Sequence, residues 1–170
     1  MILLALDPSS TCTGYAVFDG KKLDEPGLLR PSASYCAERR TAQIVADLRE
    51  LLDAIQPTDI VIEVPSRFPG TGSKAGATGR LAIYGMAVGE IRRVCNDWTN
   101  SDGTKPEIHS VDERTWTKGR SKAKRQRQLS ILYPKHTAAL VENDRGGDAF
   151  DAIGVGAYWL ANHKMDEVTR

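Results

Sequence analysis

Short apolar runs alternate with longer segments of helical periodicity along this chain. Residues 2–6 form an apolar run that ends at Asp7, and residues 15–18 form a second run, followed by an Asp-Gly turn signal at 19–20. These runs predict a β-hairpin, with the first strand buried on both faces. A third strand over residues 21–36 is compatible with the sequence but poorly marked, because prolines and a glycine interrupt it.

The later segments predict helices and two further strands. Apolar residues at steps of four, three and four indicate an amphipathic helix over residues 38–56, which Pro57 ends. A β-branched run over residues 59–64 predicts a buried strand with an acid, Glu63, inside it. The remaining predictions are a helix over 80–94, a strand over 107–111, a helix over 122–133 ended by Pro134, and a last helix over 148–162.

This order of elements indicates an α/β fold with a mixed sheet and two closing helices. The chain has 170 residues, of which 41% are hydrophobic, so it can bury one substantial core but is short for two domains. We therefore expect a single domain over residues 1–163, followed by a solvated tail over residues 164–170.

Composition argues against several classes of protein. The net charge is +1, so attraction to a polyanion has to come from uneven placement of charge. The three cysteines show no paired spacing, which argues against a disulfide framework and a cysteine-based zinc site. The apolar start has no basic leader, and no segment reaches the roughly 20 apolar residues of a membrane span. We expect a soluble, cytoplasmic protein without a membrane partner.

Four carboxylates stand where packing alone would not place them. Asp7 ends an apolar strand and Glu63 interrupts another, while Asp148 and Asp151 are three residues apart on the last helix and so share one face. A buried carboxylate has to be paired, protonated or bound to a cation. Each position also has an ordinary explanation: an Asp-Pro turn at Asp7, a solvent-facing strand edge at Glu63, and a helix N-terminus at Asp148.

Taken together, the four acids predict a site for hard divalent cations. Oxygen ligands select Mg²⁺ or Mn²⁺, and the histidines at 109, 136 and 163 share no metal-like spacing, which argues against zinc. Two such ions about 4 Å apart can activate a water and stabilise the leaving oxygen of a phosphodiester. Hydrolysis of a phosphate ester is therefore the chemistry that this pattern favours.

The segments that carry the acids resemble the RuvC-type Holliday junction resolvases along essentially the whole chain. Residues 4–10 (Leu-Ala-Leu-Asp-Pro-Ser-Ser), followed by Thr-Gly-Tyr at 13–15, are similar to the family's opening motif. Ile-Glu-Val at 62–64 is similar to its second acidic strand, and residues 147–156 resemble its closing Asp-x-x-Asp helix. This chain departs from the pattern at Ser9, where the family often has Gly, and after Glu63, where Phe68 is the candidate for the family's aromatic wedge.

This resemblance implies a ribonuclease-H-like fold with a mixed five-stranded sheet, a homodimer, and paired symmetric nicks in four-way DNA junctions. By the same resemblance, the catalytic residues would hold two Mg²⁺ ions, with Mn²⁺ able to substitute. No nucleotide cofactor is expected, because the Gly-rich segment after Glu63 lacks the Gly-Lys-Ser/Thr ending of a phosphate-binding loop. The implied catalytic and metal-binding residues are Asp7, Glu63, Asp148 and Asp151.

Cationic side chains gather after the last predicted strand, with six between residues 118 and 127. Such a run is often an ordinary solvated helix face. Here part of it precedes a helix, where backbone N–H groups can also meet phosphates. Further candidates flank the Gly-rich loop. The predicted DNA-binding residues are Arg67, Phe68, Lys74, Arg80, Lys118, Arg120, Lys122, Lys124, Arg125 and Arg127.

Three alternatives stay open at this point. The small residues at 82, 85 and 89 would allow close helix packing, either between two copies of the chain or within one. The same four acids would serve another ribonuclease-H-like nuclease that acts on RNA or branched DNA. A non-catalytic junction-binding module would use the basic surface but would not need all four acids.

Overall fold

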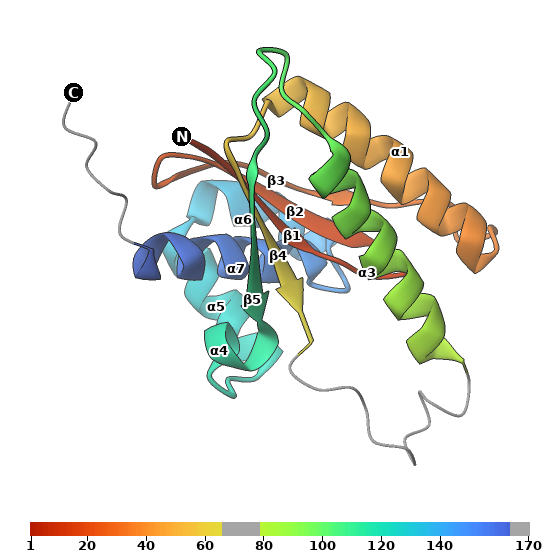
Figure 1. Ribbon diagram of the computed structural model, residues 1–170. Helices are drawn as coiled ribbons and strands as arrows, with labels where there is room; N and C mark the ends of the chain where they lie inside the picture. The colour runs from red at the N-terminus through yellow and green to blue at the C-terminus, as the bar shows by residue number, and fades with distance from the viewer. Residues whose placement is uncertain (66–78, 164–170) are drawn as a thin grey trace.

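Helices cover both faces of a mixed five-stranded sheet in the computed structural model, which describes residues 1–65 and 79–163 (Figure 1). The sheet order is β3-β2-β1-β4-β5. β1 pairs antiparallel with β2 and β2 with β3, whereas β1, β4 and β5 are parallel. The predicted mixed sheet is therefore confirmed. Its strands are β1 (Ile2–Asp7), β2 (Thr13–Asp19), β3 (Lys22–Leu29), β4 (Asp59–Val64) and β5 (Glu107–Asp112).

The turn signal at residues 19–20 joins β2 to β3. Asp19 pairs with Lys22, and Gly20 has φ +56°, a conformation that glycine adopts without a steric penalty. The poorly marked strand, β3, forms in spite of Pro26, because it is the edge strand and has a free side where a missing N–H is tolerated. The proline that obscured the pattern thus marks the edge of the sheet.

The alternation of side chains along β1 divides the core in two. Leu4 and Leu6 pack with α1 (Ala37–Ile55) and with α3 (Arg80–Asp97) on one face. Leu3 and Ala5 pack on the opposite face against α7 (Asp148–Asn162), which crosses the sheet there. β1 is therefore buried on both faces, as its apolar run predicts.

The chain after β5 contains more helices than predicted. Four follow β5 up to residue 163, because two short helices, α4 (Glu113–Thr117) and α6 (Pro134–Asn143), accompany α5 (Lys122–Leu132) and α7. α4 begins where the Asp112 side chain accepts the backbone N–H groups of Arg114 and Thr115. Pro134 ends α5 but also begins α6, since proline fits a first helical turn, where no N–H is required.

None of the helices in the described part of the chain combines the length and apolar character needed to cross a membrane. Two predicted regions lie outside the described residues. One is the Gly-rich loop with Arg67, Phe68 and Lys74, and the other is the tail over residues 164–170.

Candidate active site

Two neighbouring strand ends bring Asp7 and Glu63 to one face of the sheet. Leu6 pairs with Ile62 in the parallel ladder, so the next residue on each strand is one of the two acids. Both acids lie on the α7 face, because side chains two residues apart on a strand share a face and the preceding Ala5 and Val61 pack there. Burial, followed by the charges of Glu63, Asp151 and Asp148, raises the pKa of Asp7 well above its ordinary value.

Helix α7 delivers the other two acids at its first turn. Asp148 begins the helix and Asp151 lies one turn later, with only 6% of its surface exposed. Gly14 of β2 pairs with Asp7, and a side chain at Gly14 would collide with the Asp148 carbonyl. Glycine is therefore required at this position for the start of α7 to lie directly over the strands that carry Asp7.

A fifth acid, Asp144, fixes the start of α7. Its carboxylate oxygens accept the backbone N–H groups of Asp148 at 2.9 Å and Phe150 at 3.1 Å, and the side chain is buried. Between Asp144 and the helix, Gly147 has φ +75°. Asp144 is not among the predicted site residues. Its signal was an aspartate followed by Arg-Gly-Gly immediately before the first helical acid.

Trp116 orients the side chain of Glu63. The indole Nε1 donates a hydrogen bond of 2.6 Å to Oε2 of Glu63, and the ring packs directly against Gly154 of α7. Burial raises the pKa of Glu63 to about 7, the hydrogen bond from Trp116 opposes this rise, and the charge of Asp151 adds to it. Trp116 is a buried core residue that also orients a candidate catalytic acid, a role that the sequence pattern did not indicate.

Two of the predicted DNA-binding cations lie inside the acidic cluster. Lys122 Nζ is 3.0 Å from Oδ2 of Asp151, and Arg125 places Nη2 at 3.0 Å and Nε at 3.2 Å from Oδ1. The Lys122 side chain passes over Gly147, where a Cβ would collide with it. The first turn of α5 therefore neutralises Asp151, so these two cations are part of the site, with 14% of the Arg125 side chain and 41% of the Lys122 side chain exposed.

The other cations of the basic run remain on the surface. Lys118 and Arg120 are exposed in the segment between α4 and α5, and Arg120 donates to Oε1 of Gln128 at 2.7 Å. Lys124 and Arg127 are exposed on α5. Arg80 begins α3. The structure thus divides the predicted run into an inward pair and an outward set on the same segment.

The cluster is rich in negative charge. Burial is the largest cause of the raised pKa values of Asp7, Glu63 and Asp148, and repulsion between the carboxylates adds to it. Lys122 and Arg125 compensate only part of this charge, chiefly at Asp151. A cluster of carboxylate oxygens whose negative charge is only partly compensated suits a divalent cation of the Mg²⁺ type.

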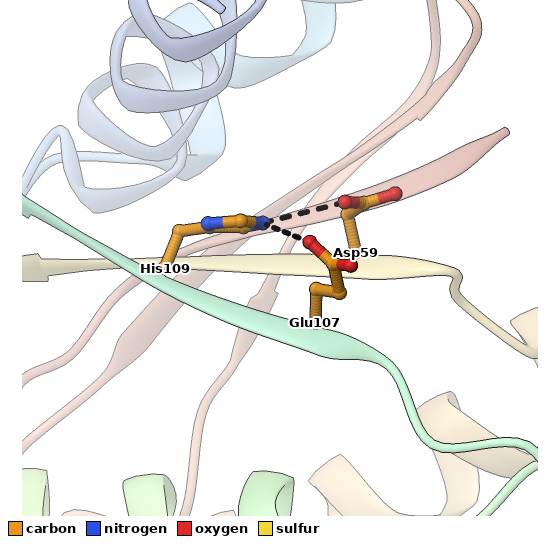
Figure 2. Close-up of side chains that lie close together, drawn as sticks. All are labelled: Asp59, Glu107 and His109. Carbon is orange, nitrogen blue, oxygen red and sulfur yellow. Dashed lines mark hydrogen bonds and ion pairs between the residues drawn. The ribbon is translucent and has the colours of Figure 1, made fainter. Parts of the chain in front are cut away.

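A second group of potential metal ligands lies at the opposite end of the same strands. Asp59, Glu107 and His109 offer ligand atoms that all lie within 4.8 Å of one another (Figure 2). No other group of three or more His, Cys, Asp or Glu side chains within residues 1–65 and 79–163 is as compact. The spacing of the histidines does not predict this group, because the partners of His109 are acids on two strands and not other histidines.

Comparisons with known proteins show a fold relationship. No family model and no curated protein matches the sequence. The structure of Thermus thermophilus RuvC in complex with a Holliday junction substrate aligns with a TM-score of 0.59 at 15% identity, over 92% of this chain and 90% of that chain. A second T. thermophilus RuvC structure gives 0.57 at 15% identity, over 92% of each chain. The yeast mitochondrial Holliday junction resolvase Ydc2 gives 0.58 at 14% identity, over 93% of this chain and 77% of that chain. The predicted fold, that of the RuvC-type resolvases, is thereby confirmed.

Proposed function

We propose that this chain is a metal-dependent endonuclease that cuts four-way DNA junctions by paired symmetric nicks. The observation that carries the proposal is the convergence of Asp7, Glu63 and the first turn of α7 at one end of a resolvase-like sheet. Burial and mutual repulsion make it unfavourable to bring several charged carboxylates together, and the packing of the fold does not require it. A site for hydrolysing a phosphodiester does explain them.

In this proposal Asp7, Glu63, Asp148 and Asp151 hold two Mg²⁺ ions, with Mn²⁺ able to substitute. When bound, such ions supply Lewis acidity and an activated water at a scissile phosphate. Trp116 keeps Glu63 oriented by its hydrogen bond. Lys122 and Arg125 hold Asp151 in place. The proposed DNA contacts come from the exposed cations Lys118, Arg120, Lys124 and Arg127, with Arg80 and the cations of the loop before it.

Paired nicks require two active sites, and we propose that a second copy of the chain supplies the other one. Gly85 and Gly89 of α3 have nothing within 4 Å of where a side chain would begin, and Met86 between them is 37% exposed. Ala82 is exposed on the same helix. These small residues do not pack within the described chain, which favours the intermolecular alternative.

The test is incubation of the purified protein with a synthetic four-way junction, a linear duplex and an RNA/DNA hybrid, each with Mg²⁺, with Mn²⁺ and with a chelator. We expect symmetric nicks in the junction alone, and only with a divalent ion. Cleavage of the hybrid would indicate a different ribonuclease-H-like nuclease. Binding of the junction without cleavage under any ion would indicate a non-catalytic module, and either result would overturn the proposal.

A further inference from the structure

The group at the opposite end of the sheet is built by the register of two parallel strands. Asp59 begins β4 and pairs with Glu107, which begins β5. His109 lies two residues further along β5, so its side chain shares a face with that of Glu107. His109 Nε2 is 3.3 Å from Oδ1 of Asp59 and 3.8 Å from Oε2 of Glu107 (Figure 2). One imidazole nitrogen and two carboxylate oxygens thus face one another.

The surroundings hold these side chains in place. Thr58 Oγ1 donates to Oδ2 of Asp59 at 2.8 Å, which leaves Oδ1 directed at the imidazole. The His109 ring lies against the indole of Trp159, with the ring centroids 4.8 Å apart, and the His163 ring stacks on the same indole at 4.5 Å. Asp59 and His109 are therefore restrained by neighbours, which favours a preformed ligand pair.

A second observation in the same place concerns Trp159. This residue is only 5% exposed, and its indole Nε1 has no hydrogen-bond partner within the described part of the chain. Buried N–H groups are nearly always satisfied, so an unpaired one beside His109 indicates that a polar group from beyond the described residues belongs nearby. A hydrated ion would bring such groups.

We propose that Asp59, Glu107 and His109 bind one divalent transition-metal ion of the zinc class. An imidazole nitrogen with two carboxylate oxygens suits Zn²⁺ or Co²⁺, whereas Mg²⁺ prefers oxygen ligands alone. Ligand atoms within 4.8 Å of one another need only a small contraction to reach bonds of roughly 2.0–2.2 Å to one ion. The exposed Glu107 side chain is free to supply that movement, since 80% of its surface is accessible.

Such an ion would join the edge strand β5 to β4, and so stabilise the sheet on the side that has no further strand. It would lie at the other end of the strands from the acids proposed to cut DNA. The inference is therefore independent of the proposed nuclease activity. The competing explanation is an ordinary ion pair between His109 and Asp59, which requires no metal.

The experiment uses metal-free, untagged protein that carries Asp7→Asn, so that the acids of the candidate active site compete less for the ion. Calorimetric titration with Zn²⁺ should show one ion per chain, and Zn²⁺ should raise the melting temperature. We expect His109→Gln to weaken Zn²⁺ binding by at least about tenfold, because it removes a ligand. Glu107→Gln should weaken it similarly, and this exposed position keeps the result interpretable if His109→Gln fails to fold.

The matched control is His136→Gln, which changes a histidine on α6 and should leave Zn²⁺ affinity unchanged. Equal Zn²⁺ affinity in the parent, His109→Gln and Glu107→Gln proteins would overturn the proposal. So would stabilisation by Mg²⁺ equal to that by Zn²⁺. Junction cleavage in Mg²⁺ by a His109→Gln protein that retains Asp7 reports separately on the proposed nuclease, so failure of one inference is distinguishable from failure of the other.

Discussion

The two ends of the sheet present different chemistry on the same face. At the carboxyl ends of β1 and β4, Asp7 and Glu63 meet the two acids in the first turn of α7, and Lys122 and Arg125 compensate only part of the negative charge. At the amino ends of β4 and β5, two acids meet one imidazole beside the last turn of α7. One helix thus serves both ends. Its N-terminus suits a cluster of acids through the helix dipole, while its C-terminal residues bring aromatic rings.

Substitutions at the two ends of the sheet should differ most in their effect on the rate of DNA cleavage. We expect Asp7→Asn to lower the rate of junction nicking in Mg²⁺ by a factor of about 10² or more, because it removes a carboxylate that would hold the Mg²⁺ ions at the reacting phosphate. Junction binding should persist, since the substitution lessens negative charge near DNA. Single-turnover nicking and gel-shift titration measure the two properties.

Asp59→Asn is the matched control, since it makes the same chemical change on the same face of the sheet at the other end. It should leave nicking in Mg²⁺ at the parent rate. If Asp59→Asn abolishes nicking while Asp7→Asn does not, the reaction belongs to the amino end, and our assignment of the two ends is inverted.

A smaller effect should follow from removing the support of Glu63. Trp116→Phe keeps the ring but deletes the N–H that donates to Glu63. We expect nicking to fall by roughly 10–100-fold at limiting Mg²⁺. The midpoint of its pH profile should move upward, because that hydrogen bond lowers the pKa of Glu63. A loss of activity without a shift of the midpoint would reduce Trp116 to a packing residue.

The control for this change is Trp98→Phe. Trp98 also donates its indole N–H to a carboxylate, Oδ1 of Asp53, at 2.9 Å, but this pair lies between α1 and the end of α3. It should alter neither the rate nor the pH midpoint. A similar shift in both variants would mean that loss of any indole hydrogen bond disturbs the whole protein.

Sequence periodicity predicted the elements that carry the acids, because each contributes a local signal. The bounds predicted for β4 and α7 match the structure, and the unbroken apolar run of β1 correctly predicts burial on both faces. Contacts between distant segments left no such signal. Trp116 lies 53 residues from Glu63 along the chain, and only the packing of α4 against α7 brings them together.

The same limit explains why the spacing of the histidines along the sequence did not indicate the group around His109. His109 meets Asp59 across a parallel strand pair, 50 residues away along the chain, so no spacing rule could join them. Lys122 and Arg125 were correctly seen as cationic, but composition alone could not tell that α5 turns them inward onto Asp151. The pairing of β4 with β5 brings His109 to Asp59, and the orientation of α5 brings its two cations to Asp151.

The acids at the carboxyl end should also make the free energy of unfolding depend on pH. In metal-free protein, burial raises the pKa of Glu63 to about 7, whereas an unfolded glutamate titrates near pH 4.3. The folded state therefore holds a proton that the unfolded state has lost over this window, so the free energy of unfolding should fall as the pH rises from about 4 to about 7. The fall should be on the order of 1–3 kcal/mol.

Denaturant titration at several pH values, in chelator, measures this fall. Glu63→Gln should make it smaller, because the amide carries no charge in either state, while the raised pKa values of Asp7 and Asp148 keep the remainder. Glu50→Gln, at an exposed glutamate of α1, is the control and should keep the parent slope. Stability of the parent that rises with pH over the same window would contradict the electrostatic account of the site.

The smallest effect should come from the outward cations of α5. Replacing Lys124 and Arg127 by Gln should weaken junction binding and reduce the slope of log K against log salt by about one unit for each phosphate that is no longer neutralised. Both cations are exposed, and the ion pairs to Asp151 come from Lys122 and Arg125 instead, so nicking at saturating protein should stay near the parent rate. Lys21→Gln with Lys22→Gln removes the same charge beside the β2–β3 turn, at the other end of the sheet, and should leave the slope unchanged. Equal slopes for the two double variants would mean that DNA does not follow α5, because a path specific to the carboxyl end has to distinguish the two pairs.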